Sequence, residues 1–329
     1  DNLISFYKNG IKYYTISKLL LSSKSLLESY LSEIISNNQI DIMINQSTFQ
    51  ITFDLLILLK KSLGYKLIST IHTDPKAALK SIKDECYKSS FYLNPLLKMF
   101  RYLKFYLIYP LSYILRKKSL ADKYTMMYNE SDFVVLLSKN FIQPFINISK
   151  IKNTSKLKAI PNPNSYYPNP KNKLRKKKQI LFVSRMIFEA KRPDRMLKIW
   201  KEVFDKFSDW KLIFIGDGPD LNNLKGMSRK LKLKNIDFIG RHDPTKYYAE
   251  SKIICLTSSY EGFGMVLTEA MQYSCVPIAY NSYESLDDII QHGKNGFKVK
   301  PFKINEFLKY LKNLMANDNL LTEMAKNTI

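Results

Sequence analysis

The stretch IICLTSSYEGFGMVLTEAM (residues 253–271) joins three kinds of segment in one continuous run. Its beginning, IICLTS (253–258), is a short apolar run typical of a buried β-strand. A turn containing Gly262 and Gly264 follows, and a helix is expected at 265–274. A strand that leads through such a turn into a helix is the repeating unit of a parallel α/β sheet.

The same alternation of strand and helix continues through the rest of residues 179–329. Further apolar strands are expected at 179–184, 211–216, 236–240, 276–280 and 296–300, and further helices at 194–207, 219–232 and 304–316. Six strands joined by crossovers predict a Rossmann-like open sheet, in which ligands bind beyond the carboxyl ends of the strands. The residues that directly follow these strands are therefore the first candidates for a functional site.

Residues 1–163 show a second, shorter series of this kind. Strands are expected at 40–45, 66–72, 132–138 and 157–163, and helices at 53–64, 91–129 and 139–149. The segment 164–178 has no apolar periodicity and carries six basic residues, which favours a linker over a long surface loop. We therefore predict an N-terminal Rossmann-like domain at 1–163, this linker, and a C-terminal Rossmann-like domain at 179–329.

Composition limits the classes of function that the chain can have. It contains 329 residues, of which 45% are hydrophobic and 25% charged, as in ordinary globular proteins. Three cysteines without a CxxC spacing exclude a zinc site and a disulfide framework, and they indicate a reducing, cytoplasmic compartment. The sequence contains no run of 18 apolar residues, so no transmembrane helix is predicted.

The formal net charge of +23 is the unusual feature of the composition. Such a charge is typical of proteins that bind nucleic acid or anionic membranes. The excess is shared by both halves of the chain, however, and only eight of the 52 basic residues are arginine, the usual choice for recognising bases and phosphates. We therefore expect no nucleic-acid partner.

Basic residues follow the first strand of the C-terminal series. Arg185 comes directly after it, and Lys191 and Arg192 precede the next helix. Cations at the carboxyl end of a parallel strand, beside a helix N-terminus, are suited to binding a diphosphate. Because arginine is scarce in this chain, we favour this interpretation over a solvated basic loop.

Glycines follow the second strand of this series. Gly216 and Gly218 flank Asp217 at a strand-to-helix turn, where a main chain without side chains can approach a ribose or a phosphate. The full GxGxxG pattern is absent, so a tight turn without a ligand is an equally good interpretation.

Two glutamates accompany the turn in the opening stretch. Glu261 precedes Gly262, Phe263 and Gly264, and Glu269 lies one to two turns into the following helix. The helix N-terminus offers free N–H groups to an anion, reinforced by the helix dipole. A carboxylate at Glu269 can accept both hydroxyls of a ribose, and Glu261 can bind sugar hydroxyls. The alternative, helix capping with a surface salt bridge, explains less of this pattern.

Residues 179–315 resemble the donor-binding domain of the family-4 retaining glycosyltransferases, also called glycosyl transferases group 1. The resemblance rests on an ordered series of motifs: FVSR…K (182–191), LIFIGDGP (212–219), IDFIGR (236–241), the two glutamates at 261 and 269, VPIAY (276–280) and GKNGFKVKPF (293–302). The first domain matches more loosely, through a histidine at a strand end and AIPNP (159–163). The family has the GT-B fold, in which two Rossmann-like domains face each other across a cleft.

This resemblance implies a role for each matching residue. Arg185 and Lys191 would hold a nucleotide diphosphate, Glu269 the ribose, and Glu261 the transferred sugar. The remaining contacts would be those of the Gly262, Phe263, Gly264 and Met265 amides with the distal phosphate, and those of Ile239 and Arg241 with the nucleobase. Two positions depart from the family: Ser184 replaces a glycine beside the diphosphate, and Ser274-Cys275 replaces a glycine after the glutamates.

The resemblance also implies the reaction. A sugar would move from a UDP- or GDP-sugar to a saccharide acceptor, lipid-linked as in bacterial surface-polysaccharide and lipopolysaccharide assembly, with retention of the anomeric configuration. His72 would reach the transferred sugar, or else it is an ordinary loop histidine. Because the chain has no DxD pair, Arg185 and Lys191 would neutralise the leaving diphosphate, and no metal or other cofactor is expected. By the same comparison, the sequence is expected to be truncated at both ends.

The segment LLKMFRYLKFYLIYPLSYILRKK (96–118) has six basic and no acidic residues among many aromatic and aliphatic ones. It is equally consistent with two interpretations. One is a helix in the interface of an anionic membrane, which implies a peripheral location on the inner face of the cell membrane. The other is an ordinary helix pair broken at Pro110.

Two other functions remain as alternatives. A nucleotide-sugar epimerase has the same fold, but it needs an acid and a base acting on the donor, and no convincing pair is evident. A basic membrane- or nucleic-acid-binding protein with a degenerate nucleotide pocket is disfavoured by the intact Arg185, Lys191, Glu261 and Glu269.

Overall fold

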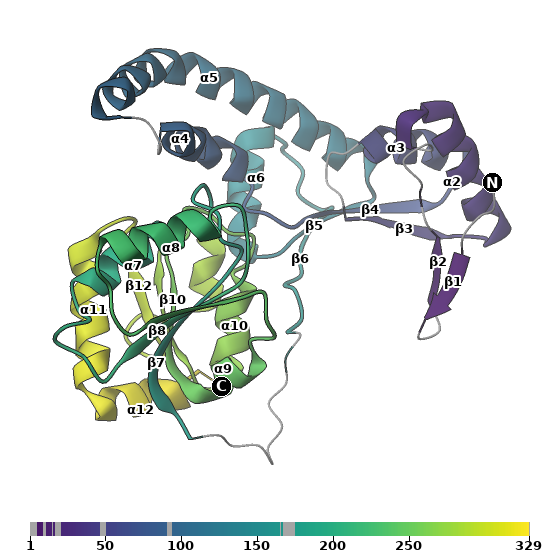
Figure 1. Ribbon diagram of the computed structural model, residues 1–329. Helices are drawn as coiled ribbons and strands as arrows, with labels where there is room; N and C mark the ends of the chain where they lie inside the picture. The colour runs from purple at the N-terminus through teal and green to yellow at the C-terminus, as the bar shows by residue number, and fades with distance from the viewer. Residues whose placement is uncertain are drawn as a thin grey trace. The chain divides into compact units, whose positions relative to one another are not determined.

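In the computed structural model the chain forms two compact units (Figure 1). One contains residues 1–70 and 126–134, and the other residues 71–125 and 135–329. Within these ranges, the residues described are 5–8, 11–14, 16, 21–46, 51–90, 94–164, 166 and 175–328. Most of the predicted linker therefore lies outside the described residues, and the predicted domain boundaries stay a prediction.

The N-terminal series forms a four-stranded sheet in the order β3-β4-β5-β6. Its strands are β3 (Ile42–Asn45), β4 (Lys66–Ile71), β5 (Phe133–Leu136) and β6 (Leu157–Ala159), so all four strands expected in this region are present. β3 and β4 are parallel, as the α/β alternation predicts. A separate antiparallel hairpin, β1 (Ser5–Lys8) and β2 (Ile11–Tyr14), precedes them.

The helices of this region differ from prediction in three places. They are α2 (Lys24–Asn37), α3 (Ile51–Leu63), α4 (Ala77–Ser90), α5 (Pro95–Glu130), the 3-10 turn η1 (Lys139–Phe141) and α6 (Ile142–Ser149). Neither α2 nor α4 was predicted. The expectation of a helix pair broken at Pro110 is wrong, because α5 runs through that proline as one helix. Beyond the proline, Arg116 of α5 binds Glu85 of α4 at 2.8 Å.

The C-terminal series forms a six-stranded sheet in the order β12-β11-β10-β7-β8-β9, with every pair of neighbours parallel. The strands are β7 (Lys177–Val183), β8 (Lys211–Ile215), β9 (Ile236–Gly240), β10 (Ser251–Leu256), β11 (Val276–Tyr280) and β12 (Phe297–Val299). Counted along the chain, this is the 3-2-1-4-5-6 order of the doubly wound fold. The predicted Rossmann-like sheet is confirmed.

Helices cover both faces of this sheet, as Figure 1 shows. They are α7 (Pro193–Lys201), α8 (Leu221–Lys230), α9 (Thr245–Glu250), α10 (Met265–Gln272), the 3-10 turn η2 (Glu284–Asp288), α11 (Ile304–Ala316) and α12 (Asp318–Lys326). Side chains from α7, α8, α11 and α12 pack in one core, and side chains from α9 and α10 in the other.

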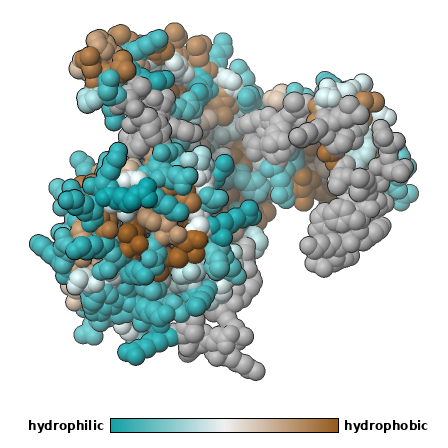
Figure 2. Space-filling view, viewed as in Figure 1, coloured by the Kyte–Doolittle hydropathy of each residue, from teal (hydrophilic) through white to brown (hydrophobic). Residues whose placement is uncertain are grey.

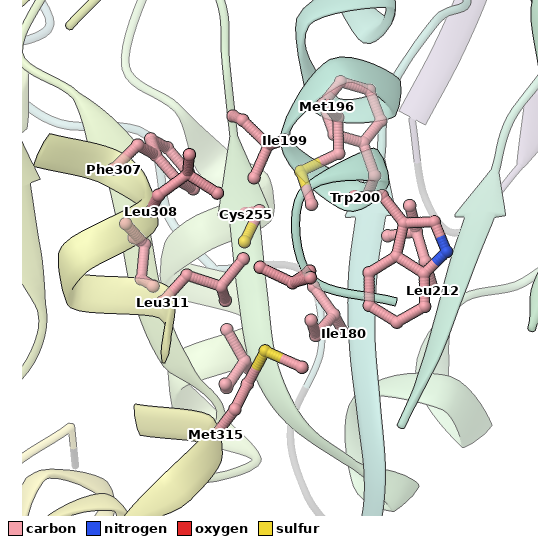
Figure 3. Packing of buried hydrophobic residues seen from close by; sticks show 14 of the residues in the cluster. Ile180, Met196, Ile199, Trp200, Leu212, Cys255, Phe307, Leu308, Leu311 and Met315 are labelled. Atoms are coloured by element: carbon pink, nitrogen blue, oxygen red, sulfur yellow. The ribbon is translucent and has the colours of Figure 1, made fainter. Parts of the chain in front are cut away.

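Alternation along β10 separates the two cores. Ile253 and Cys255 belong to the core under α7 and α11, whereas Ile254 and Leu256 belong to the core under α9 and α10. Figure 3 shows Cys255 among Ile199 of α7 and Leu311 of α11. Because these four side chains are at most 1% exposed, residues 253–256 of β10 have no polar face and form a continuous apolar run.

The strand order fixes where a ligand can bind. Chain connections run to opposite sides from β7 and β10, which are neighbours in the sheet. The loops that follow these two strands therefore separate at their common edge, and this switch point is where open α/β sheets bind ligands. Most of the candidate residues lie in the loops that leave this edge.

Candidate functional site at the switch point

A buried ion pair joins the two loops at the switch point. The Nζ atom of Lys191, in the loop after β7, lies 2.7 and 2.6 Å from the two carboxylate oxygens of Glu261, in the loop after β10. The hydroxyl of Ser258 donates to the same carboxylate at 2.7 Å. Glu261 is only 8% exposed, so its charge is held by these two donors. Sequence reasoning selected Lys191 and Glu261 but assigned them to different parts of a donor, and it missed Ser258.

The loop that carries Glu261 lies against the main chain at His72. A Cβ atom on Gly262 would come within 2.0 Å of the His72 carbonyl oxygen, so only glycine allows this approach. Nearby, the N–H of Asp74 donates to the carbonyl of Glu261 at 3.2 Å. The hydroxyl of Ser285 donates to the carbonyl of Gly262 at 3.1 Å. The structure therefore brings His72 and Glu261 together, although they are far apart in the sequence.

The helix α10 begins at this loop. Gly264 precedes Met265 as the N-cap residue with φ of +82°, a left-handed conformation that favours glycine. A Cβ atom there would lie 2.7 Å from the hydroxyl of Tyr283. The first N–H groups of a helix have no partner within it, so they are available to an anion that lies ahead of Gly264.

Tyr283 is a residue of this site that sequence reasoning missed. Its side chain is 2% exposed, and its hydroxyl has no hydrogen-bond partner in the described part of the chain. Burial, with a smaller contribution from the charge of Glu261, raises the pKa of Tyr283 well above its ordinary value. The hydroxyl therefore stays protonated and can donate a hydrogen bond. Its position three residues after β11, at the same edge of the sheet, is the signal that was available.

Glu269 lies one turn further into α10 and is held by a second tyrosine. Its Oε2 atom accepts a hydrogen bond from the hydroxyl of Tyr248, on α9, at 2.9 Å. Burial raises the pKa of Glu269, and the Tyr248 hydrogen bond partly opposes this rise. The bond also fixes the orientation of the carboxylate, as the binding of two neighbouring hydroxyls would require. Tyr248 too was missed, because α9 was not predicted.

Other candidates line a hollow of about 450 Å³ beside the ends of β7, β8 and β9. The hollow contains Arg185, the loop Gly216-Asp217-Gly218 and Arg241. Both arginines are exposed, and neither forms a salt bridge within the described residues. Two unpaired guanidinium groups beside a turn of glycines can bind an anion such as a phosphate.

The remaining predicted residues take supporting positions. Ile239 and Phe263 are partly buried against the core under α9 and α10. Arg192 is only 7% exposed, and it pairs internally with Asp194 through contacts of 3.0 and 3.1 Å. It adopts a left-handed conformation with φ of 51° at the start of α7, where Asp194 is fully buried. The structure thus places Arg192 in the framework of α7, with its guanidinium directed at Asp194.

Carboxylate, histidine and cysteine side chains do not gather into a metal site in the part of the chain that the structure describes, where no group of three or more such residues could hold a metal ion. The cations nearest the candidate donor site are Lys191, Arg185 and Arg241. The absence of a metal requirement stays a prediction.

A doubly wound sheet, with a helix start and buried carboxylates at its switch point, defines the class of Rossmann-like α/β domains. Residues 167–329 match the family described as "Glycosyl transferases group 1", and this C-terminal part of the chain belongs to that family. The predicted family is confirmed.

Curated relatives agree with this assignment. Over 176 residues the chain is 35% identical to an uncharacterized glycosyltransferase of Haemophilus influenzae, covering 52% of this chain and 49% of the relative. It is 30% identical over 148 residues to the lipopolysaccharide 1,6-galactosyltransferase of Salmonella typhimurium, covering 42% and 40% of the two chains. The chain therefore spans about half the length, or less, of these relatives.

Solved structures extend the likeness to the whole chain. S. aureus TarM, crystallised with UDP and other ligands, superposes with a TM-score of 0.71 at 19% identity, covering 97% of this chain and 56% of TarM. Anabaena HepE in complex with UDP and glucose gives a TM-score of 0.68 at 16% identity, covering 95% and 77%. This likeness confirms the predicted GT-B fold class.

Proposed function

We propose that this protein is a glycosyltransferase that moves a sugar from a nucleotide-sugar donor, a UDP- or GDP-sugar, to a saccharide acceptor. The observation that carries the proposal is the buried Lys191–Glu261 pair at the start of α10, beside the oriented carboxylate of Glu269. The family assignment supports it, as do relatives named for polysaccharide and lipopolysaccharide synthesis. Solved structures of similar fold contain UDP.

Each group of the site has a place in donor binding. Arg185 and Lys191 would bind the diphosphate, with the first amides of α10 at the distal phosphate. Glu269 would bind the ribose, and the strand end from Ile239 to Arg241 would lie against the base. Glu261 would bind the transferred sugar. Lys191 retains a third ammonium hydrogen while it binds both oxygens of Glu261, so it can contact the Glu261 carboxylate and a diphosphate at the same time.

The reaction that we propose retains the anomeric configuration. The bond between the anomeric carbon and the phosphate oxygen breaks, and the acceptor oxygen forms the new bond on the same face. The proton of the acceptor hydroxyl passes to the leaving diphosphate. Cations fixed around that diphosphate stabilise its developing charge without rearranging, which is the usual source of such catalysis. Transfer in the presence of EDTA and NMR of the anomeric proton in the product test metal independence and retention.

The donor site is tested by nucleotide binding. UDP, GDP and ADP are titrated in thermal unfolding, where a ligand at 100 times its Kd should stabilise the protein by about 2.7 kcal/mol. One nucleotide should stabilise the wild type. Arg185→Ala should weaken the binding of that nucleotide roughly tenfold, through loss of a charged hydrogen bond. Arg229→Ala, on the exposed surface of α8, is the matched control. Absence of binding by all three nucleotides would refute the proposal.

Product analysis separates transfer from the alternative chemistry of the same fold. UDP-glucose and UDP-N-acetylglucosamine are incubated with and without a saccharide acceptor, and the sugar products are identified. A transferase yields a new glycoside only with the acceptor and releases the nucleoside diphosphate. Conversion of the donor into its epimer without an acceptor would identify an epimerase instead.

The acceptor that we propose is lipid-linked, because α5 presents an apolar surface of the kind that lies on membranes. Four aliphatic residues on one face of the helix are 59–75% exposed: Leu103, Leu107, Leu111 and Ile114. Figure 2 shows hydrophobic residues gathered over α5 at the top of the view. The same stretch has six basic and no acidic residues, which suits anionic head groups.

None of the helices within the described residues combines the length and the hydropathy that crossing a bilayer requires. We infer that α5 lies in the plane of an anionic membrane on its cytoplasmic side. The aliphatic face would enter the interface between head groups and acyl chains.

A further inference from the structure

A second cavity lies next to the donor site and contains none of the residues assigned to the donor. Its volume is about 680 Å³, and its walls come from α4, α5, α6 and the loops after β10, β11 and β12. Lys76, Lys80 and Lys83 enter it from α4 and the segment before it, and Lys117 enters from α5. Four lysines around one cavity would repel one another unless anions compensate them.

Acidic residues compensate only two of the four lysines. Lys76 binds Glu284 at 2.5 Å, and Lys80 binds Asp74 at 2.5 Å and Glu284 at 3.4 Å. Lys83 and Lys117 form no ion pair within the described residues. The nitrogen of Lys83 lies 5.3 Å from the centre of the Tyr109 ring. Because this ring is neutral, the contact does not cancel the charge of Lys83.

The other acidic residue of the cavity wall does not change this balance. Asp287 is engaged by Lys298, which does not line the cavity. Lys83 and Lys117 therefore give the cavity an excess of positive charge, which favours an anionic ligand.

Aromatic rings occupy the same wall as the two uncompensated lysines. Tyr109 and Tyr113 lie one turn apart on α5 with ring centres 5.9 Å apart, and Phe302 lines the cavity from the loop after β12. Small-molecule sites typically combine apolar and aromatic walls with a few placed polar groups. Aromatic faces beside cations suit a sugar ring that carries a phosphate.

The cavity and the donor site share a wall. Tyr283 lines the cavity, and its hydroxyl abuts Gly264 at the start of α10. Ser282, also in the wall, donates to the carbonyl of Ser258 at 2.7 Å, and Ser258 binds Glu261. A ligand in the cavity would therefore lie beside the proposed position of the transferred sugar.

We propose that this cavity binds the acceptor through a phosphate group, with Lys83 and Lys117 as its cationic contacts and Tyr109 and Tyr113 against the adjoining sugar. This inference rests on the proposed function and names the class of acceptor, a phosphate-bearing saccharide. The phosphate can belong to a sugar phosphate or to a lipid diphosphate that carries the sugar, and the chemistry recognised is the same in both.

The test uses the full chain with the donor site saturated by UDP, so that added phosphates cannot bind there. Four probes are titrated by calorimetry: glucose 1-phosphate, geranyl diphosphate, inorganic phosphate and methyl α-glucoside. We expect glucose 1-phosphate to bind at least tenfold more tightly than inorganic phosphate or the uncharged glucoside. Geranyl diphosphate binding as tightly as glucose 1-phosphate would assign the phosphate to a lipid, and weaker binding would assign it to a sugar phosphate.

Matched variants locate the binding. Lys83→Gln/Lys117→Gln should weaken the binding of glucose 1-phosphate roughly tenfold or more, since hydrogen bonds to charged groups are among the stronger polar contacts. Lys118→Gln/Lys139→Gln removes the same charge from exposed positions outside the cavity and should leave binding unchanged. UDP affinity should be the same in both.

Two results would overturn this inference while leaving the donor site intact. One is equal affinity for glucose 1-phosphate in the two double variants. The other is binding of inorganic phosphate as tight as that of the sugar phosphate. Failure of the protein to bind any of UDP, GDP and ADP would instead refute the proposed function.

Discussion

The Nζ atom of Lys191 lies within 2.7 Å of both carboxylate oxygens of Glu261, and this pair links the loops after β7 and β10. Removal of the amine leaves a carboxylate that is 8% exposed with Ser258 as its other recorded side-chain donor. Breaking a fully buried pair costs about 3–5 kcal/mol. Because the Lys191 side chain is 26% exposed, we expect Lys191→Met to lose about 2 kcal/mol of unfolding free energy.

A double-mutant cycle checks the origin of that loss. Glu261→Gln removes the unpaired charge, so Lys191→Met/Glu261→Gln should be more stable than Lys191→Met alone when unfolding in urea is measured. A coupling energy of about 0.5–3 kcal/mol is typical of residues in contact. Additive effects of the two substitutions would show that the pair contributes no stability.

The ionised carboxylate of Glu269 is expected to lower the stability of the folded protein while it contributes to nucleotide binding. Burial raises its pKa from the ordinary value of 4.5, so the folded protein binds this proton more tightly than the unfolded chain does. The ionised carboxylate therefore destabilises the folded state. This cost is absent below the unfolded pKa and complete above the folded pKa. Glu269→Gln should accordingly raise Tm at pH 7.5.

Two measurements distinguish this from a general stabilising effect. The Tm difference between Glu269→Gln and wild type should shrink as the pH falls toward 4.5, because wild-type Glu269 then becomes neutral as well. At pH 7.5 the variant should bind its nucleotide roughly tenfold more weakly, through loss of a charged hydrogen bond to the ribose. An unchanged Kd would remove Glu269 from the binding site.

The same substitution at two glycines should have opposite effects. Gly262→Ala places a Cβ atom 2.0 Å from the His72 carbonyl oxygen, and the resulting shift should cost about 1–3 kcal/mol of unfolding free energy. Gly226→Ala, inside α8, meets no atom within 4 Å and should add up to about 1 kcal/mol through better helix propensity. Urea unfolding of both variants measures this, and equal effects would contradict the close approach at Gly262.

The C-terminal sheet was predictable because its strands are recognisable in the sequence as short runs of apolar residues. β10 and β11 are buried on both faces, so each is a continuous apolar run, and their parallel order follows from the intervening helices. The ends of β7 and β10 then located Arg185, Lys191 and Glu261 without any knowledge of distances. Their placement at one edge follows from topology alone.

Pairings between side chains were not predictable in the same way. Arg192 lies beside Lys191 in the sequence, but a left-handed turn at Arg192 directs its guanidinium to Asp194. Tyr248 and Tyr283 lie in segments whose sequences contain no motif, and their roles follow from their contacts with Glu269 and Gly264. The proline in α5 suggested a break, but the helix is continuous through it, and residues on both sides of Pro110 contact α4 or the cavity beside it.

Contact of α5 with an anionic membrane gives the last prediction. Leu103→Ser/Leu107→Ser removes two aliphatic side chains that are 59% and 75% exposed, so it should reduce binding to the membrane without lowering Tm. Each buried methylene contributes about 0.8 kcal/mol to such binding, so the partition coefficient should fall more than tenfold.

Sedimentation with vesicles of phosphatidylglycerol and phosphatidylcholine measures this coefficient. Ile42→Ser, at a 56% exposed position on β3, is the control, and its binding should equal that of the wild type. Wild-type binding should also require the anionic lipid and weaken with salt, because the basic residues of α5 contribute through screened charges. Equal sedimentation of the double variant and the wild type would show that the aliphatic face of α5 does not enter the membrane.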